Sequence, residues 1–337
     1  MQCNPFTSDT FTTIWSKHFN SAKLGIPFSF FENLLFIKHR FLNLYTNVGK
    51  TFTKGITYCI TNPNPKELGS KVFLIYDVPA YFASVEPPRD PLKRIRVKQY
   101  PGYLIELKDY KDLNDYMNNA FNRKSRYKLR SYKRQLEANY NISYQMYYGD
   151  MSKTEYNLLF EQFRQLLVKR YDDKKISNNN LEAHEWSFYK EVVYPMILKK
   201  QASLYVIFDN EKPIGIMLNY LSMHAVHIAI TVFDIDYRKS NVGTVNIMNL
   251  IQWSLENNFK IVDFSKGHYD YKQRWGSIKY DFEYHIVYNS NSVCSKSIAF
   301  FLQHWFKLKQ YLRDKKVNEL LHKFTFMFAG KAKAANT

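Results

Sequence analysis

Apolar and polar positions follow clear periods over the second half of the chain and weaker ones before it. In residues 1–105, the segments GITYCI and KVFLIY combine β-branched and aromatic residues, which predicts two short strands joined by a turn at PNPKELGS. The segment ASVEPPRDPLK contains three prolines and predicts an irregular connection. This third of the chain is therefore expected to mix short helices and strands.

From residue 106 onward, helical and strand spacings alternate. Helices are predicted over 109–119, 121–138, 154–171, 181–200 and 241–256, with a short one near 269–275. Strands are predicted over 142–148, 203–208, 213–221, 225–233, 260–264 and 282–288. Two basic helices are expected to close the chain. The order β-α-α-β-β-β-α-β-α-β from residue 142 predicts a mixed α/β fold, in which antiparallel strands lead into one parallel strand.

Positive charge is concentrated in two stretches of the chain. The formal net charge is +18. Residues 123–134 hold seven Lys or Arg and no acid, and residues 295–337 hold nine basic and two acidic residues, so each stretch has a surplus of seven. A surface this basic attracts the phosphates of a nucleotide, a nucleic acid or an anionic membrane. A solvated basic face with no partner is the alternative.

The cysteines and the termini bear on the cellular compartment. Cys3, Cys59 and Cys294 are widely spaced, so neither a disulfide framework nor a zinc-binding pair is predicted. No secretion signal or membrane-spanning stretch is recognisable, and we expect a cytoplasmic protein without a metal. Apolar residues within 298–312, flanked by lysines, predict an amphipathic helix. It either packs on its own domain or touches the inner face of an anionic membrane.

The segment DYRKSNVGTVNIM, residues 236–248, joins a predicted strand to a predicted helix. The first N–H groups of a helix lack internal partners, and the helix dipole adds roughly half a positive charge there, which suits a pyrophosphate. Gly243 permits close approach of the backbone, and Asn241 tolerates a positive φ. Arg238 and Lys239 add positive charge. A turn without a ligand is the alternative.

These residues resemble the Arg/Gln-x-x-Gly-x-Gly/Ala motif that N-acetyltransferases of the GNAT superfamily carry at the same junction. Arg238, Asn241 and Gly243 fall on the three motif positions, with Asn241 in place of the first glycine. In that superfamily the motif holds the pyrophosphate of acyl-coenzyme A. The resemblance implies that acyl-CoA, such as acetyl-CoA, is the co-substrate. The residues implied to bind it are Arg238, Lys239, Asn241, Val242, Gly243 and Thr244.

A second segment, IVDFSKGHYDYKQRWG at 261–276, is similar to one found in the CelD-like branch of this superfamily, which is associated with polysaccharide and lipid modification. The basic segment NRKSRYKLRSYKRQLE is similar to one shared by that branch and the FemABX peptidyltransferases, which have two GNAT-like modules. The resemblance implies a GNAT-like mixed sheet flanked by helices. It further implies a degenerate N-terminal module at 1–105, an acyltransferase domain at 106–290, and basic amphipathic helices with a tail at 291–337.

Acyl transfer from a thioester to an amine implies roles for residues of the second segment. Asp263, where the sheet is expected to open, is the candidate base or amine-orienting residue. Tyr271 is the candidate acid for the leaving thiolate, and Lys272 would polarise the carbonyl or hold an anionic group. A backbone amide near 231–233 is expected to bind the thioester oxygen. The structural alternatives are a helix cap for Asp263, a core ring for Tyr271 and a surface position for Lys272.

Further candidates concern substrate and metal binding. Arg126 and Arg130 are expected to contact a phosphate or carboxylate of the substrate, and Tyr269 is expected near the same opening. His224 and His227 lie three apart on a predicted strand, so alternation would send them to opposite faces and no metal pair is predicted.

Three functions stay open from the sequence. The first is an acyl-CoA-dependent N-acyltransferase acting on a small-molecule, sugar or lipid-linked amine in polysaccharide or cell-envelope metabolism. The second is a FemABX-like transferase that uses aminoacyl-tRNA, which the positive charge favours. The third is a non-enzymatic basic nucleic-acid-binding protein whose aromatic side chains stack on bases.

Overall fold

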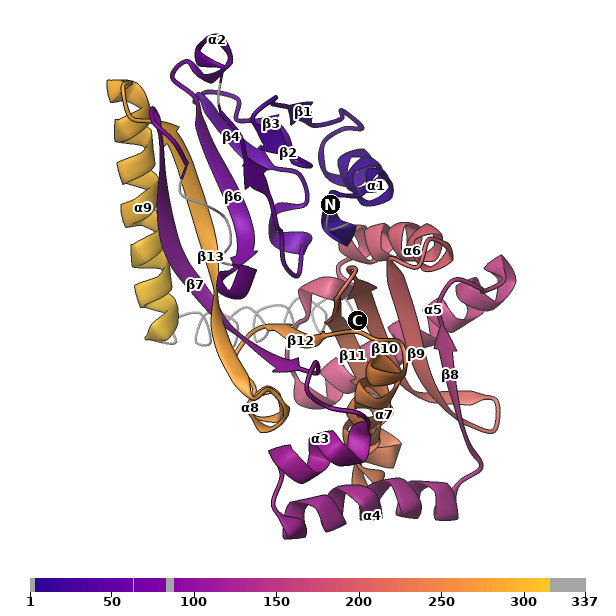
Figure 1. Ribbon diagram of the computed structural model, residues 1–337. Coiled ribbons are helices and arrows are strands. Elements are labelled where there is room, and N and C mark those ends of the chain that lie inside the picture. The colour runs from indigo at the N-terminus through magenta and orange to yellow at the C-terminus, as the bar shows by residue number, and fades with distance from the viewer. Residues whose placement is uncertain (1–3, 63, 83–87, 316–337) are drawn as a thin grey trace.

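The computed structural model describes residues 4–62, 64–82 and 88–315, which form a large sheet covered by helices (Figure 1). The helices are α1 Asp9–Phe19, α2 Pro65–Leu68, α3 Leu113–Ala120, α4 Arg123–Asn139, α5 Lys153–Lys174, α6 Ala183–Leu198, α7 Val242–Glu256, α8 Asp270–Trp275 and α9 Val293–Asp314. The strands are β1 Ile26–Pro27, β2 Phe31–Glu32, β3 Leu35–Lys38, β4 Leu44–Asn47, β5 Cys59–Ile60, β6 Val72–Pro79, β7 Leu92–Glu106, β8 Ile142–Tyr147, β9 Ala202–Asp209, β10 Lys212–Leu221, β11 Ala225–Phe233, β12 Ile261–Lys266 and β13 Ile278–Asn289.

The main sheet joins both halves of the chain through exchanged strands. In the part of the chain that the structure describes, its order is β1-β3-β4-β6-β13-β7-β12-β11-β10-β9-β8. β7 follows β6 in the chain, yet β13 lies between them, and β13 follows β12, yet β7 lies between those two. Each half therefore completes its share of the sheet with a strand from the other half.

The strand order is symmetric about the central β7–β13 pair. Next to β13, β6 is antiparallel to it and β4 is parallel to β6, while next to β7, β12 is antiparallel to it and β11 is parallel to β12. A bulge interrupts β6 and another interrupts β12. Each bulge contains a non-glycine residue at positive φ, Asp77 (63°) in β6 and Ser265 (59°) in β12. The two halves therefore repeat one mixed α/β arrangement, and the GNAT-like fold class predicted from the sequence is confirmed.

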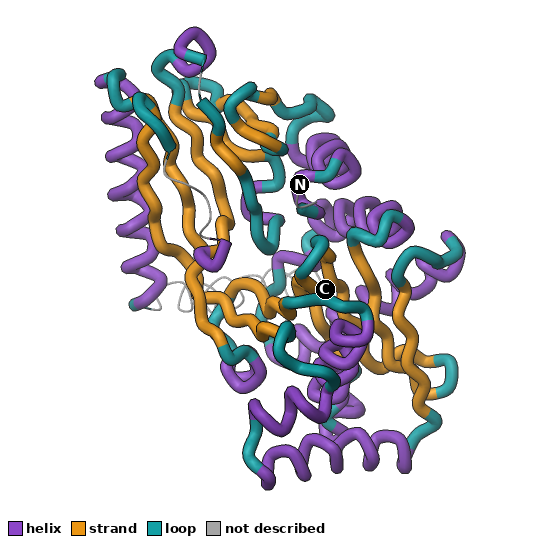
Figure 2. Tube along the Cα trace, viewed as in Figure 1, coloured by secondary structure: helices purple, strands orange, loops and turns teal. Residues whose placement is uncertain are grey.

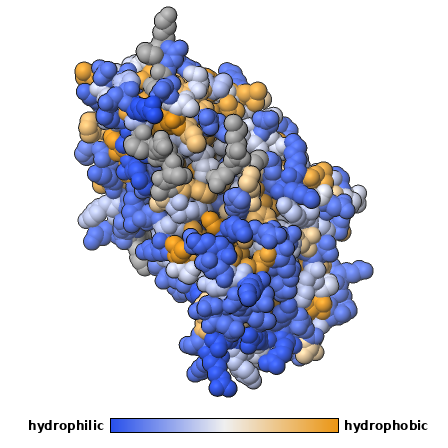
Figure 3. Space-filling view, in the orientation of Figure 1, coloured by the Kyte–Doolittle hydropathy of each residue, from blue (hydrophilic) through white to orange (hydrophobic). Residues whose placement is uncertain are grey.

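Helices cover both faces of the sheet (Figure 2). Along β9, Leu204 and Val206 face a core built with α5 and α6, whereas Tyr205 and Ile207 face a second core built with α7. α3 and α4 pack outside α7, and the surface over them is mainly hydrophilic (Figure 3). α9 packs on β7 and β13. Among the described helices, none has the length and apolar content needed to cross a bilayer.

The helices and strands predicted after residue 106 are present, with ends shifted by a few residues. In the first third, KVFLIY lies within β6 except for Lys71. Of GITYCI, only Cys59–Ile60 forms a strand, so that prediction is largely wrong. The long strand β7 was not anticipated, because Pro101 and Gly102 interrupt its pattern. Of the two basic helices expected at the end, α9 is one, and the other lies outside the described residues. The domain boundaries near 105 and 290 fall at the ends of β7 and β13 and remain predictions.

The strand exchange predicts that both halves unfold together. Phe73→Ala in β6 removes a fully buried ring packed against Phe28 and Phe36, which costs about 3–5 kcal/mol. We expect a single urea transition at a lower midpoint, identical by tryptophan fluorescence and circular dichroism. Phe41→Ala, at an exposed ring, is the matched control and should leave the midpoint unchanged. Two separate transitions in the Phe73 variant would contradict the prediction.

Candidate active site

The junction between β11 and α7 leaves a helix start open. A 3₁₀ segment, Ile235–Ser240, leads to Asn241, which has φ 54° and ψ 33° and so takes the left-handed conformation that its residue type tolerates. α7 begins at Val242, and no described side chain caps it. The Asn241 side chain instead donates to the backbone oxygen of Lys239 (3.2 Å). The backbone N–H of Thr244 donates to the backbone oxygen of Asn241 (2.8 Å), whereas the N–H of Gly243 makes no such bond to a described residue and therefore stays available for a ligand.

A pocket of about 260 Å³ lies at this helix start. Four of the six predicted cofactor-binding residues line it, namely Arg238, Asn241, Gly243 and Thr244. The other two do not, because Val242 is buried beneath the helix start and Lys239 is exposed outside the lining. The pocket is completed by Arg170, Thr231, Phe233, Ile247, Tyr271, Arg274 and Trp275.

Three arginines make the pocket positive. Arg238 donates to the carboxylate of Asp173 (2.5 Å), which offsets part of its charge. Arg170, from α5, lies 4.6 Å from the ring centre of Phe233, and Arg274 comes from α8. Neither Arg170 nor Arg274 forms an ion pair with a described residue, so both are free to meet an anion. The sequence does not single them out, because only the fold brings them beside residues 238–244.

The sheet opens beside this pocket because β11 and β12 pair over only three residues. Their parallel ladder ends at His227 and Asp263. The rest of β11, including residues 231–233, has no partner strand on this side. An extended ligand can therefore lie along the open edge of β11.

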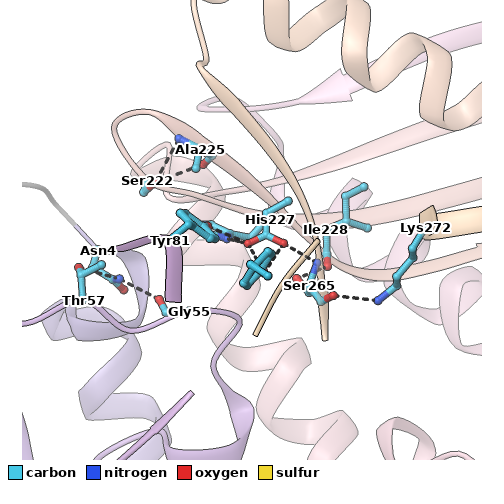
Figure 4. A network of polar contacts seen from close by, with 12 residues as sticks. Asn4, Gly55, Thr57, Tyr81, Ser222, Ala225, His227, Ile228, Ser265 and Lys272 are labelled. Carbon is cyan, nitrogen blue, oxygen red and sulfur yellow. Dashed lines mark hydrogen bonds and ion pairs between the residues drawn. The ribbon is translucent and has the colours of Figure 1, made fainter. Parts of the chain in front are cut away.

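Ser265 and Lys272 hold the opening in place (Figure 4). Ser265 takes its positive φ just beyond the ladder, and its hydroxyl donates to the backbone oxygen of Ile228 (2.8 Å). The ammonium of Lys272 reaches back from α8 and donates to the backbone oxygens of Ser265 (3.2 Å) and Lys266 (2.5 Å). These bonds satisfy carbonyl groups that lose their ladder partners where the strands diverge.

Asp263 lies at the opening, as expected, and is fully buried there. Its carboxylate accepts hydrogen bonds from the hydroxyls of Tyr81 (2.8 Å) and Tyr280 (2.7 Å) and from the backbone N–H of Ser265 (2.7 Å). Tyr81 belongs to the N-terminal half, so the carboxylate joins the two halves. The alternative of a helix cap is wrong, because the N-cap residue of α8 is Tyr269.

Lys272 is also buried, so the alternative of a surface lysine is wrong. Burial lowers the pKa of Lys272 to about 7, although the negative charge of Asp263 opposes this shift, and the positive charges of Lys54 and Lys266 add to it. Near neutral pH the side chain therefore exchanges between ammonium and amine.

Two tyrosines of the same segment lie around Lys272. Tyr271 is half-buried and lines the pocket at the start of α7, and burial raises its pKa, so its hydroxyl stays protonated at neutral pH. Tyr269 is exposed, with its ring centre 6.1 Å from that of Tyr271 and 5.3 Å from the Lys272 nitrogen. The structure therefore brings Tyr269, Tyr271 and Lys272 together beside the pocket.

His227 is a candidate that the sequence did not single out for this chemistry. It is almost fully buried, and its Nδ1 lies 3.5 Å from the Asp263 carboxylate. Neither ring nitrogen forms a hydrogen bond with a described residue. His224 instead lies on the surface of a separate groove, and no cluster of metal-binding side chains occurs in the described ranges.

Arg126 and Arg130 lie elsewhere. They line a groove of about 870 Å³ between α3, α4 and α7. Arg126 donates to the backbone oxygen of Phe121 (2.6 Å), and Arg130 donates to the side chain of Asn114 (3.1 Å). The structure does not bring these arginines beside Asp263 or Lys272, and their contact with substrate stays a prediction.

Comparison with known proteins identifies the region that holds the pocket. Residues 123–273 match the family model described as Acetyltransferase (GNAT) domain. The match includes the start of α7, Asp263 and Lys272. This part of the chain is therefore similar to a GNAT acetyltransferase domain. No curated protein matches the chain.

Solved structures extend the likeness in fold over both halves of the chain. A conserved protein of unknown function from Bacteroides thetaiotaomicron has a TM-score of 0.51 at 9% identity, with 85% of this chain and 91% of that chain covered. FemX has a TM-score of 0.51 at 10% identity, with 75% and 83% covered. L-PGS from Bacillus licheniformis has a TM-score of 0.42 at 12% identity, with 69% and 73% covered. At identities of 9% and 10%, the likeness to the first two structures concerns the fold alone.

The lowered pKa of Lys272 predicts that stability depends on pH. Between about pH 7 and 10.5 the unfolded chain retains a proton that the folded protein has lost, so the free energy of unfolding rises with pH over this range. Lys272→Met removes this contribution and should flatten the rise. Urea unfolding at several pH values measures it. Lys279→Met, at an exposed lysine, is the control and should keep the parent slope. An unchanged slope in the Lys272 variant would show that the site is not desolvated.

Proposed function

We propose that the protein is an N-acyltransferase that moves an acyl group from acyl-CoA to an amine. The observation that carries the proposal is the uncapped start of α7 in a pocket lined by Arg170, Arg238 and Arg274. Free N–H groups at a helix start and guanidinium groups both bind phosphate. The match to an acetyltransferase domain covers α7 and supports the same reaction class.

The donor pyrophosphate is proposed to accept a hydrogen bond from the N–H of Gly243, which lines the pocket, with the buried Val242 directly before it. A Cβ atom on Gly243 would lie 3.3 Å from the Phe233 ring, so glycine allows α7 to start close against β11. Arg170 and Arg274 would contact the phosphates, and Lys239 would add charge from the surface. The rest of the donor then follows the open edge of β11 toward the divergence of the strands.

In the transfer, the amine nitrogen attacks the thioester carbon, the carbon–sulfur bond breaks, and the thiolate leaves. A backbone N–H within residues 231–233 binds the carbonyl oxygen, and the ammonium form of Lys272 adds positive charge beside it. Tyr271 lines the donor pocket, so its hydroxyl is placed to give its proton to the leaving thiolate, and it then becomes a phenolate until a proton returns to it.

Asp263 is proposed to accept the proton of the amine indirectly, by way of a hydroxyl group that is hydrogen-bonded to its carboxylate. Its carboxylate is enclosed by Tyr81, Tyr280 and Ser265, so an acceptor does not meet it directly. The proton is proposed to reach Asp263 along one of the hydrogen bonds that its carboxylate accepts from the hydroxyls of Tyr280 (2.7 Å) and Tyr81 (2.8 Å). Asp263 also raises the pKa of Lys272 and so favours its ammonium form.

The acceptor is proposed to approach past Tyr269, whose exposed ring gives an apolar surface at the edge of the pocket. An amine on a small molecule, a sugar or a lipid-linked sugar suits such a surface. We place the reaction in polysaccharide or cell-envelope metabolism, on the resemblance to the CelD-like branch.

A second candidate is a FemABX-like transferase that takes its acyl group from aminoacyl-tRNA. The observation in its favour is α4, whose seven Lys and Arg residues form no ion pair with any described residue. Unpaired cations in a row bind a nucleic-acid backbone. The third function, a non-enzymatic nucleic-acid-binding protein, does not account for the acetyltransferase match.

Gly243→Glu tests the donor site, because it puts a carboxylate where the pyrophosphate is proposed to bind. We expect coenzyme A to bind about 100-fold more weakly, since a lost charged hydrogen bond alone costs about 1.5–3 kcal/mol. Titration calorimetry measures the affinity. Gln252→Glu adds the same charge further along α7 and should leave it near the parent value.

Unchanged affinity in the Gly243 variant would rule out this donor site. Measuring the melting temperature of the protein with each ligand distinguishes acyl-CoA from aminoacyl-tRNA as the donor, because a ligand that binds the folded state raises the melting temperature. A rise with aminoacylated RNA but none with coenzyme A, weakening as salt increases, would favour the second candidate.

Asp263→Asn tests the proton path. Turnover should fall about 100-fold, while coenzyme A affinity stays near the parent value because the donor site lies on other elements. Losing the negative charge lowers the pKa of Lys272 further, so the alkaline limb of the pH–rate profile should move to lower pH. Asp281→Asn, at a surface ion pair with Lys98, is the control. Parent-like turnover with an unshifted profile would remove Asp263 from the mechanism.

A further inference from the structure

The helix α9 has two apolar faces, and the described fold covers one of them. Its inner face lies against β7 and β13 through the buried residues Ser295, Ala299, Leu302 and Phe306. Figure 1 shows α9 as the outermost element on this side of the sheet. The opposite face of the helix therefore points away from the described part of the chain.

The outer face carries a stripe of large apolar side chains. They are between 41% and 78% exposed, and comprise Val293, Phe300, Phe301, Trp305, Leu308, Tyr311 and Leu312. Spacings of three, four and seven residues place them on one side of the helix. Scattered exposed apolar residues need no explanation, but a continuous stripe of this kind marks an interaction surface.

Lysines border this stripe along both edges. Helical spacing puts Lys296 and Lys307 on one edge and Lys309 on the other. All three are exposed, and none forms an ion pair with a described residue. Asp314 is the one acidic residue in the sequence of α9. The occupant of the stripe must therefore be apolar in the middle and anionic at its margins.

We propose that α9 lies flat on an anionic lipid bilayer. The aromatic stripe enters the boundary between headgroups and acyl chains, where phenylalanine, tryptophan and tyrosine side chains are favoured. The bordering lysines then meet lipid phosphates. This contact does not depend on the identity of the acyl donor. It would hold the fold at the surface where a lipid-linked acceptor is found.

Charge disfavours a second copy of the chain as the occupant. Two α9 helices packed along their stripes would bring Lys296, Lys307 and Lys309 of one copy near the same lysines of the other. The acid Asp314 cannot neutralise them, so like charges repel across that interface. Anionic lipid provides the opposite charge.

The test is sedimentation of the full chain with vesicles made from equal parts phosphatidylglycerol and phosphatidylcholine, and with vesicles of phosphatidylcholine alone. The parent should bind the mixed vesicles, bind phosphatidylcholine much less, and lose affinity as salt increases. The double variant Phe301→Ser, Trp305→Ser should partition into mixed vesicles at least about 10-fold less. The matched control, Leu24→Ser with Leu158→Ser, changes exposed residues outside α9 and should bind as the parent does.

Three results would overturn the proposal. The first is parent-like vesicle binding by the Phe301 and Trp305 double variant. The second is a melting temperature of this variant well below that of the control, which would show that the rest of the chain covers the stripe. The third is light scattering that gives a dimer for the parent and a monomer for the variant, which would identify a second copy as the occupant.

Discussion

The short parallel contact between β11 and β12 is the constraint on which the site depends. Three residue pairs hold the strands together, and then Ser265 turns β12 away by taking a left-handed backbone conformation. Were the ladder longer, the edge of β11 would be occupied and no extended donor could lie along it. Lys272 and the Ser265 hydroxyl bond the carbonyl groups at the divergence, so the opening is a stable part of the fold.

Buried carboxylates tie the two halves to one another at two places, in or beside the bulges of β6 and β12. The carboxylate of Asp263 in β12 accepts a hydrogen bond from the hydroxyl of Tyr81 in the N-terminal half. The carboxylate of Asp77 in β6 forms an ion pair with the ammonium of Lys266 in the C-terminal half, at 2.6 Å between oxygen and nitrogen. Both carboxylates are fully buried. Removing one partner of such a pair leaves a charge without compensation in the interior, which is strongly destabilising. Asp263 is therefore both a group proposed for the chemistry and a group that joins the two halves. A substitution there is expected to change activity and stability together.

Particular residues show which features of the fold and of the site could be predicted from the sequence. The order of elements after residue 106 and the left-handed Asn241 were predictable, because helix and strand periods and residue-type preferences are local. Arg170 and Arg274 were not, since they meet the start of α7 only after α5 and α8 pack. Tyr81 and His227 were missed as neighbours of Asp263 for the same reason. The pattern of β7 was obscured by Pro101 and Gly102, which lie where the pairing of β7 with both β12 and β13 is irregular.

The exchanged strands also constrain how the protein is made. A chain leaving the ribosome presents β6 and β7 long before β13 exists, so the edge of β6 that β13 will occupy stays unpaired during synthesis. An unpaired edge rich in valine, phenylalanine and isoleucine is a template for wrong pairing with other chains. The edge of β6 in the nascent N-terminal half therefore stays open to such pairing until β13 has been made. The first hundred residues, released alone, contain β1, β3, β4 and β6, which pair with one another, but the edge of β6 would lack its partner β13.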